Sequence, residues 1–486
     1  MKKKKILSLF LSILIACSCI YPVAATNDDA AAEAETTISD TTTDTSIDTT
    51  VVDTGVPSHT VKAKAALLLE LGSGQALLEQ NADEQVYPAS LTKVMTCLLT
   101  LEHGTLTDTV TVSETALQNL DAAGSTAGLK VGEQLTVEEL LYCIMLSSAN
   151  EACNVAAEYI AGSVDAFVEM MNEEAKALGC TGTHFANPHG LHDENHYTTA
   201  RDLSLIVQEA MKSQTFLTIT STVTHTVPAT NLSEERELFT TNLLETPGTQ
   251  YYYEYASGIK TGFTTPAGRC LISTAQRPDS DLHLLSVVCG AEDVTAEDGS
   301  IINENFTETK ALFEYGFENY SFDTIQEATP VTEIPVFHSA GCDAAVLAAD
   351  QPITAVMPKD YDETQLEKTL YLDNPNGVEA PISKGQKLGT MTVSYQGREL
   401  GTANLVAITD TPRSELSAQV SKTGNFLTEH PILSVTGSVA LLFILYLIIN
   451  NVKRAKHRKR RRQQMARQRR QQEIIEFPGN RDNRWE

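Results

Sequence analysis

Two residues three positions apart, Ser90 and Lys93, could form a nucleophile and its base. A serine hydroxyl attacks a carbonyl only when a neighbouring group removes its proton, and a lysine whose pKa is lowered can do so. An apolar pattern typical of a helix follows directly, from Val94 to Leu101. If this helix begins near Ser90, the amine and the hydroxyl share one face. The plainer alternative is that Ser90 only caps the helix.

Two further polar motifs lie downstream. Ser148 and Asn150 stand at a break between two apolar helical patterns, where side chains can project into a cleft. Lys260, Thr261 and Gly262 lie on a predicted strand, where a glycine lets a substrate lie close to the backbone. The plainer alternatives are that Ser148 caps the next helix and that Lys260 is an exposed strand lysine.

The chain repeats two of these motifs in unsuitable places. Ser257 precedes Lys260 by three residues, but Gly258 and the strand pattern disfavour the helix that would put them on one face. The sequence Lys-Thr-Gly recurs from Lys422, in polar sequence with no strand before it. We interpret the second copy as solvated linker, so a bare motif alone predicts little.

The periodicity predicts two folded regions. Residues 61–320 are expected to form one α+β domain, with a helical cluster packed on a mainly antiparallel sheet. Residues 321–410 alternate, contain turns at proline and glycine, and predict a small all-β domain. In the first region we expect a hairpin at 65–79, helices at 90–101, 136–146, 151–160, 163–178, 199–211 and 303–320, and strands at 255–263, 268–275 and 282–290.

The chain has 486 residues and a net charge of −27, with basic residues concentrated at both ends. An acidic body argues against nucleic acid as a partner. Residues 1–25 have the basic start, apolar core and small residues of a signal peptide, with cleavage expected after Ala25. Lipidation at Cys17 is the alternative. Residues 26–60, rich in Thr and Asp, predict a disordered acidic linker.

The other end predicts a membrane anchor. Residues 432–450 are almost continuously apolar and uncharged, long enough to span a bilayer. Residues 451–486 are strongly basic, and basic flanks stay cytoplasmic. We therefore expect a single-pass protein of the cell membrane, with its body outside, a polar linker at 411–431, a transmembrane helix and a cytoplasmic tail.

Seven cysteines lie outside the signal peptide, an odd number without a Cys-x-x-Cys pair. Most have apolar neighbours, so we expect buried free thiols and neither a disulfide framework nor a zinc site. They are Cys97, Cys143, Cys153, Cys180, Cys270, Cys289 and Cys342.

The order Ser-x-x-Lys, Ser-x-Asn, Lys-Thr-Gly resembles the signature of penicillin-binding proteins and serine β-lactamases. The flanking sequences 87–93, 148–152, 187–191 and 258–264 resemble those of low-molecular-mass D-alanyl-D-alanine carboxypeptidases. The segment at Ala380-Pro381-Ile382 resembles their C-terminal domain. The resemblance covers about residues 60–410 and implies a β-lactamase/transpeptidase-like fold.

The resemblance also implies a reaction. The substrate would be a peptidoglycan stem peptide ending in D-Ala-D-Ala, and β-lactam antibiotics would be inhibitors. Ser90 would attack the penultimate carbonyl, Lys93 would take its proton, and Ser148 would relay a proton to the departing D-alanine. No metal or cofactor is called for.

The remaining motif residues would bind the substrate. Asn150 would orient the substrate amide, and Lys260 with Thr261 would bind the terminal carboxylate. Gly262 would let the substrate lie close to the strand, and the backbone N–H groups of Ser90 and Phe263 would hold the oxyanion.

The chain lacks the Glu-x-x-Leu-Asn block that a class A β-lactamase uses to deacylate. Its absence favours penicillin as a lasting acyl inhibitor. Two alternatives stay open, a D,D-endopeptidase of the same fold and a non-catalytic wall-binding protein. His189 is interpreted as part of a structural turn, and Arg201 with Asp202 as a salt bridge at a helix start.

Overall fold

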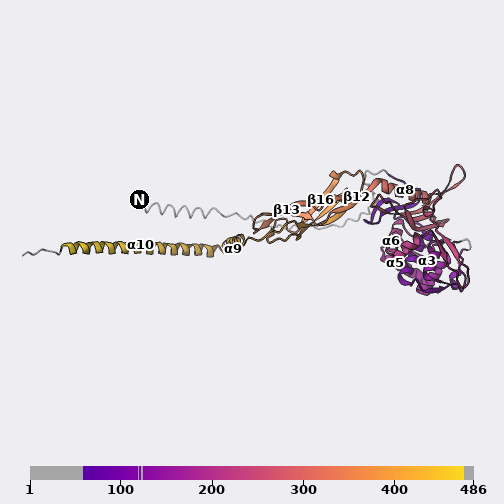
Figure 1. Ribbon diagram of the computed structural model, residues 1–486, viewed down its shortest axis with the longest axis horizontal. Helices are drawn as coiled ribbons and strands as arrows, with labels where there is room; N and C mark the ends of the chain where they lie inside the picture. The colour runs from indigo at the N-terminus through magenta and orange to yellow at the C-terminus, as the bar shows by residue number, and fades with distance from the viewer. Residues whose placement is uncertain (1–57, 119, 122–123, 476–486) are drawn as a thin grey trace, which may run out of the picture. The chain divides into compact units, whose positions relative to one another are not determined.

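The computed structural model describes residues 58–118, 120–121 and 124–475 (Figure 1). The predicted signal peptide and most of the predicted acidic linker lie outside these residues, as does the end of the basic tail.

A five-stranded antiparallel sheet forms the centre of the first region. It begins with the predicted hairpin and ends at the strand that carries Lys260, which is therefore an edge strand. The spatial order is β2 (Gln75–Gln80), β1 (Ala65–Glu70), β9 (His283–Ala291), β8 (Gly268–Gln276) and β7 (Ala256–Thr264).

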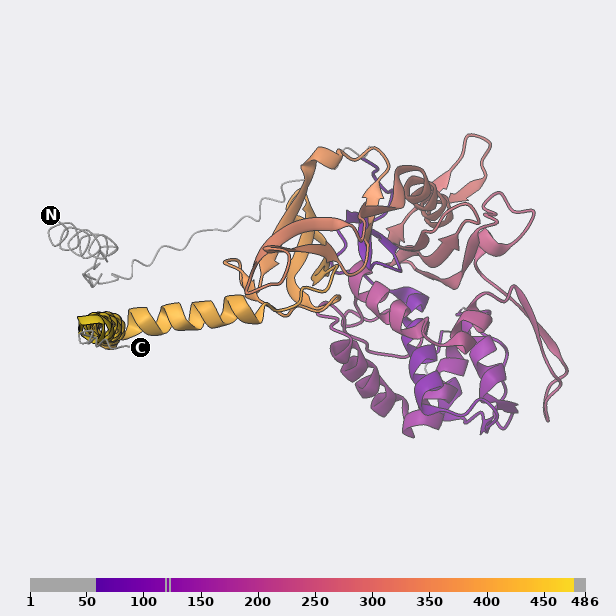
Figure 2. The same cartoon turned by 60° about the vertical axis from the view of Figure 1, so that its left-hand side comes forward.

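Alternate residues of the sheet enter two separate cores, because successive side chains of a strand point to opposite faces. Leu67 and Leu69 pack with the helical cluster, whereas Ala66 and Leu68 pack with a single long helix, α8 (Glu304–Asn319). Figure 2 shows the helices of the N-terminal half, from indigo to magenta, gathered together. The antiparallel sheet thus lies between the helical cluster on one face and α8 on the other.

The helical cluster contains the predicted helices other than α8, and one that was missed. The missed helix, α7, is short and rich in threonine, a residue of low helix propensity. The cluster consists of α2 (Lys93–His103), α3 (Val137–Met145), α4 (Asn150–Ala161), α5 (Val164–Ala177), α6 (Ala200–Ala210) and α7 (Gln214–Thr220). Two small two-stranded sheets accompany it: β3 (Thr109–Thr111) pairs with β4 (Gln134–Thr136), and β5 (Thr224–Val227) pairs with β6 (Arg236–Phe239). A third pair, β10 (Asp293–Thr295) with β11 (Ile301–Asn303), comes directly before α8.

The following region is all-β, as predicted, apart from one short 3₁₀ turn. A six-stranded sheet and a two-stranded pair enclose a core of its own, with Leu347, Met391 and Leu405 fully buried. The sheet order is β16 (Leu366–Leu372), β18 (Lys387–Tyr395), β19 (Arg398–Ala407), β14 (Ala344–Ala349), β13 (Pro330–Phe337) and β17 (Val378–Glu379); β12 (Tyr320–Gln326) pairs with β15 (Ile353–Pro358).

The polar linker predicted at 411–431 contains a helix that the sequence analysis did not anticipate. Helix α9 spans Glu415–Glu429, and the Ser414 side chain caps it by accepting from the N–H of Ser417. Serine, threonine and glycine within the segment have low helix propensity, which hid the helix. Lys422 of the repeated Lys-Thr-Gly motif is exposed on this helix and lies on no strand.

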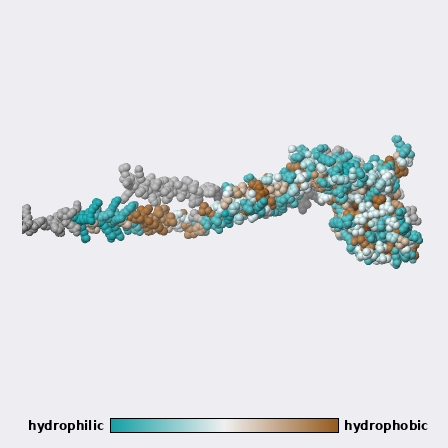
Figure 3. Space-filling view, in the orientation of Figure 1, coloured by the Kyte–Doolittle hydropathy of each residue, from teal (hydrophilic) through white to brown (hydrophobic). Residues whose placement is uncertain are grey.

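Helix α10 (Pro431–Ile475) contains both the apolar segment and the basic segment that follows it. Within the described residues it is the helix long and apolar enough to cross a membrane. Figure 3 shows the apolar part of α10 as a brown band beside the teal of its basic part. The anchor and the beginning of the tail are therefore one continuous helix.

The described cysteines are free thiols, and six of the seven are buried. Cys342, in the all-β region, is exposed.

Candidate functional site

Ser90 and Lys93 are neighbours at the start of α2. Residues Ala89–Thr92 form a 3₁₀ turn and α2 continues from Lys93, so the two residues lie one turn apart. Lys93 Nζ lies 3.0 Å from Ser90 Oγ. The Ser90 side chain caps neither the turn nor α2. The plainer alternative for Ser90 is therefore excluded, and its hydroxyl is available for chemistry.

Lys93 is completely buried, and each of its three hydrogen-bond acceptors is uncharged. Nζ donates to Ser90 Oγ, to Asn150 Oδ1 at 2.8 Å and to the backbone oxygen of His189 at 2.6 Å. Burial lowers the pKa of Lys93 to about 8, against the opposing influence of Cys153 and Glu151. An amine with this pKa is partly neutral near pH 7, as a general base must be.

The turn that carries Ser90 is held by a chain of hydrogen bonds. Thr92 Oγ1 donates to the backbone oxygen of Ala89 at 2.8 Å, and His196 Nε2 lies 2.7 Å from the same hydroxyl. Ala89 has a left-handed φ of 47°. A Cβ on Gly190, whose φ is +87°, would lie 1.8 Å from Ala89 O. The sequence analysis did not select His196, and it gave Gly190, which lies in the matched block 187–191, no role of its own, because the partners of both residues are distant along the chain.

The second motif lies at the junction of α3 and α4. Ser148 has a left-handed φ of 58° and is 4 % exposed, and Ala149 rather than Ser148 is the N-cap of α4. A non-glycine residue in this region is uncommon and is found where surrounding structure demands it. Asn150 begins α4 and places its side-chain oxygen on Lys93. The structure thus places Asn150 of the second motif next to Lys93 of the first.

A loop missed by the sequence reasoning closes this side of the site. Ser125 accepts from the N–H of Asn150 at 3.0 Å. Glu151, 3 % exposed, anchors the loop by accepting from Thr126 Oγ1 at 2.7 Å and from the N–H of Ala127 at 2.8 Å. These contacts join residues about 25 positions apart in the chain. A local sequence pattern cannot reveal contacts of this kind.

The third motif lies on edge strand β7, against the nucleophile. A Cβ on Gly262 would lie 3.1 Å from the backbone nitrogen of Ser90, so only glycine fits without displacement. Alternate N–H groups of an edge strand have no partner strand, which leaves donors for a substrate backbone or an oxyanion.

Lys260 is 2 % exposed, which excludes the alternative of an exposed strand lysine. Burial, and then the charge of Lys93, lower its pKa to about 7. Lys260 Nζ donates to Thr261 O at 3.1 Å. At Lys93, too, burial is the dominant cause of the lowered pKa.

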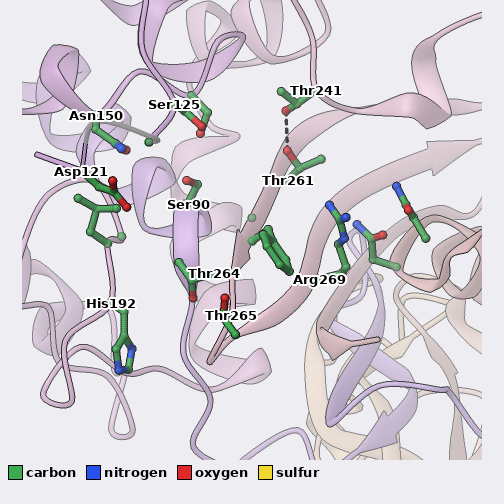
Figure 4. A pocket seen from close by; sticks show the side chains of 18 of the residues that line it. Ser90, Asp121, Ser125, Asn150, His192, Thr241, Thr261, Thr264, Thr265 and Arg269 are labelled. Carbon is green, nitrogen blue, oxygen red and sulfur yellow. Dashed lines mark hydrogen bonds between the residues drawn. The ribbon is translucent and has the colours of Figure 1, made fainter. Parts of the chain in front are cut away.

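The three motifs border one cavity of about 1020 Å³ (Figure 4). Lys93 and Lys260 are buried and are not among the residues that line it. The residues on the wall include Ser90, Ser148, Asn150, Thr261, Gly262 and Phe263 from the predicted set, and Asp121, Ser125, His192, Thr241, Arg269, Asn303 and Asn305, which sequence reasoning did not select.

Two other expectations can be compared with the structure. His189 contributes its backbone oxygen to Lys93, while its ring Nδ1 accepts from the N–H of Leu191. The predicted salt bridge between Arg201 and Asp202 is wrong. Arg201 pairs with Glu79 and Asp83, and Asp202 accepts from the N–H of Gly182, because residues adjacent in a helix do not face each other.

Glu245 supports the start of β7 by a hydrogen bond to its backbone. Its Oε1 accepts from the N–H of Gly258 at 2.7 Å, and the oxygen of Gly258 accepts from Asn242 and Ser273 at 2.6 Å each. Glu245 Oε2 is buried without a partner in the described residues. Burial raises the pKa of Glu245 to about 7. The carboxyl group thus favours its neutral form.

This geometry predicts a pH-dependent stability. Between pH 4.5 and 7 the unfolded chain loses the Glu245 proton while the folded chain keeps it, so stability falls as pH rises. In Glu245→Gln this contribution is absent, and the variant should gain up to about 3 kcal/mol relative to the unmodified chain between pH 5 and 8. Urea unfolding at several pH values measures the difference, with exposed Glu254→Gln as control. If the free energy of unfolding changes with pH in the same way for Glu245→Gln and the unmodified chain, the expectation is contradicted.

Comparison with known proteins addresses the identity of the site. The profile of the family described as D-alanyl-D-alanine carboxypeptidase matches residues 50–293. The profile of the C-terminal domain of penicillin-binding protein 5 matches residues 321–413. The chain belongs to the D-alanyl-D-alanine carboxypeptidase family.

Individual members of this family align with the chain over most of their own length. The D-alanyl-D-alanine carboxypeptidase DacF of Bacillus subtilis is 30% identical over 354 residues, 72% of this chain and 86% of the relative. DacA of Escherichia coli is 30% identical over 381 residues, 75% and 87% of the two chains. The structure of penicillin binding protein 5 from Haemophilus influenzae is similar with a TM-score of 0.56 and 29% identity, covering 74% of this chain and all of that one.

The protein is therefore a serine peptidase with the fold of penicillin-binding protein 5, as the resemblance in its sequence implied. The matches do not extend over the whole chain, and the two profiles end before helices α9 and α10.

Proposed function

We propose that this carboxypeptidase removes the terminal D-alanine from peptidoglycan stem peptides through an acyl-enzyme on Ser90. The observation that carries the proposal is the 3.0 Å contact between Ser90 Oγ and the fully buried amine of Lys93. A non-catalytic wall-binding protein would have no need to bury an amine there without a carboxylate partner.

Acylation begins with Lys93 in its neutral form. Its amine takes the proton of Ser90 as Oγ attacks the penultimate carbonyl carbon. The oxyanion that forms accepts from the backbone N–H groups of Ser90 and Phe263, which the close approach of Gly262 to Ser90 supports. Lys93 returns to the ammonium form, held by Asn150 Oδ1 and His189 O.

Collapse of the tetrahedral intermediate requires a proton on the departing D-alanine nitrogen. Ser148 lies on the cavity wall and relays this proton in our proposal, with Lys93 or Lys260 as its source. Asn150 and Thr261 border the same cavity and orient the substrate. Water then cleaves the acyl-enzyme, and a penicillin adduct on the same serine deacylates slowly.

The membrane anchor completes the proposal. The apolar part of α10 spans the cell membrane once, and its basic continuation stays on the cytoplasmic side. The catalytic domain then lies outside, where its substrate is.

The test of the function uses the full-length protein in detergent. We expect fluorescent penicillin to label it stoichiometrically, with the adduct located on Ser90 by mass spectrometry, and a D-Ala-D-Ala tripeptide to release D-alanine. A dimer of two cross-linked stem peptides, offered as substrate in a parallel assay, tests the endopeptidase alternative. An adduct on any serine other than Ser90 would overturn the assignment.

The anchor has its own test. A chain that ends after residue 430 lacks α10, and we expect it to move from the membrane fraction to the soluble fraction while still reacting with penicillin. The full-length chain should stay with the membranes after an alkaline carbonate wash. A truncated chain that still sediments with membranes would contradict the role of α10.

A further inference from the structure

The amide group between Ala89 and Ser90 is oriented by a contact at its carbonyl oxygen. This oxygen accepts from Thr92 Oγ1 at 2.8 Å, and the Ser90 nitrogen faces strand β7, where a Cβ on Gly262 would lie 3.1 Å from it. The C=O and N–H bonds of a trans amide lie in one plane and point in opposite directions. The contact at the oxygen therefore fixes the direction of the Ser90 N–H, which is an oxyanion donor in the proposed mechanism.

The Thr92 hydroxyl has one proton to donate, and His196 determines where it goes. His196 Nδ1 accepts from the N–H of Ala186 at 3.0 Å, so in the neutral ring the proton lies on Nε2. Burial lowers the pKa of His196 to about 4, so the ring is neutral near pH 7. Nε2 therefore donates to Thr92 Oγ1 at 2.7 Å, and the hydroxyl proton is directed to Ala89 O. Hydrogen bonds in such a chain strengthen one another.

The backbone at Ala89 needs this support. Its φ of 47° is left-handed, a conformation that alanine adopts only where the surrounding structure holds it. Gly190 packs directly against the same oxygen, since a Cβ there would lie 1.8 Å from Ala89 O and 2.9 Å from Thr92 Oγ1. Thr92 and His196 are 1 % and 2 % exposed, so the chain of hydrogen bonds is shielded from solvent. Hydrogen bonding and close packing thus hold the amide group together.

We propose that Thr92 and His196 are positioning residues for the oxyanion site. They hold the Ser90 N–H in the direction from which it donates to the substrate oxygen as Ser90 Oγ attacks. The inference rests on the proposed function. Neither Thr92 nor His196 is among the residues that line the cavity, so both act through the amide group and not on the substrate. An oxyanion donor acts mainly in the transition state, so a misdirected N–H slows acylation without weakening the noncovalent complex.

The first variant is Thr92→Val, which replaces the hydroxyl by a methyl group of similar size. For the full-length protein in detergent, we expect the acylation rate at saturating fluorescent penicillin to fall about 10- to 100-fold, less than the roughly 10²- to 10³-fold cost of removing an oxyanion donor. The dissociation constant of the noncovalent complex should not change. Thr92→Ser keeps the hydroxyl and should acylate at nearly the unmodified rate. Thr100→Val is the matched control, because the hydroxyl of Thr100, a buried residue of α2, also donates to a backbone oxygen, that of Thr96.

Two amide replacements of His196 separate its two hydrogen bonds. In His196→Gln the side-chain amide reaches the place of Nε2 and can donate to Thr92, whereas in His196→Asn it reaches only the place of Nδ1, beside Ala186. We expect His196→Asn to acylate as slowly as Thr92→Val, and His196→Gln to lie closer to the unmodified enzyme. A peptide boronic acid gives a second measurement, because its adduct on Ser90 is a tetrahedral anion like the intermediate. Its inhibition constant should rise by the factor by which acylation slows.

Each result decides a separate question. If the unmodified enzyme forms no penicillin adduct on Ser90 and releases no D-alanine, the proposed function fails. If it does both, the positioning role is overturned when Thr92→Val acylates at the unmodified rate, when Thr92→Ser is as slow as Thr92→Val, or when slow acylation comes with an unchanged boronate inhibition constant or a weaker noncovalent complex. If the melting temperature shows that Thr92→Val does not fold, His196→Gln and His196→Asn decide, and equal acylation rates in these two variants overturn the role.

Discussion

Replacement of Ser90 by alanine is expected to lower D-alanine release by about 10⁴- to 10⁶-fold and to abolish the covalent penicillin adduct. Alanine removes the only atom that forms the acyl-enzyme, while Lys93 keeps its acceptors on Asn150 and His189. The fold should therefore survive, and thermal unfolding should show a melting temperature close to that of the unmodified chain.

The chain supplies its own control for this variant. Ser257 also precedes a lysine by three residues, but it is exposed on β7. Ser257→Ala should label and turn over like the unmodified enzyme. Penicillin labelling that persists in Ser90→Ala, or disappears in Ser257→Ala, would show that the nucleophile has been misassigned.

Replacement of Lys93 by methionine is expected to slow acylation by about 10²- to 10⁴-fold, the usual contribution of a general base. Methionine fills a similar volume without an amine. It leaves Ser90 without a proton acceptor and leaves Asn150 Oδ1 without its donor. Stopped-flow labelling with fluorescent penicillin measures the rate, and Lys422→Met, in a repeated Lys-Thr-Gly motif on α9, is the matched control.

The pH dependence separates a basic role for Lys93 from a structural one. Because burial lowers its pKa to about 8, the neutral fraction grows about tenfold per pH unit below 8 and levels above it. The acylation rate of the unmodified enzyme should follow the same rise. Lys93→Met should lack the inflection near pH 8, and its persistence in this variant would assign the titration to another group.

The sequence was sufficient for those parts of the site that depend on local geometry. Ser90 and Lys93 are one helical turn apart, so their proximity follows from spacing alone. The break that carries Ser148 and the strand that carries Lys260 were also visible, because apolar periodicity changes at each. Leu67 and Leu68 of β1 enter different cores, because successive side chains of a strand point to opposite faces.

The parts that escaped prediction depend on contacts between distant segments. Burial of Lys260 depends on the helical cluster that covers its strand, and Arg269 reaches the cavity only through the pairing of β8 with β7. Asn305 is brought there by a helix 45 residues after Lys260. Glu245 resembles a surface glutamate in sequence, yet it is 8 % exposed beneath Gly258. None of these placements can be recognised from the sequence immediately around the residue.

The close approach of Gly262 to the backbone nitrogen of Ser90 has a consequence for antibiotic resistance. A side chain at residue 262 would push β7 away from the turn that carries the nucleophile. Such a shift would slow reaction with a β-lactam, but it would equally displace the D-alanyl peptide, which enters the same gap in our proposal. A substitution of Gly262 would therefore lower reaction with the drug and with the substrate together, so we expect resistance to arise through deacylation or expression instead.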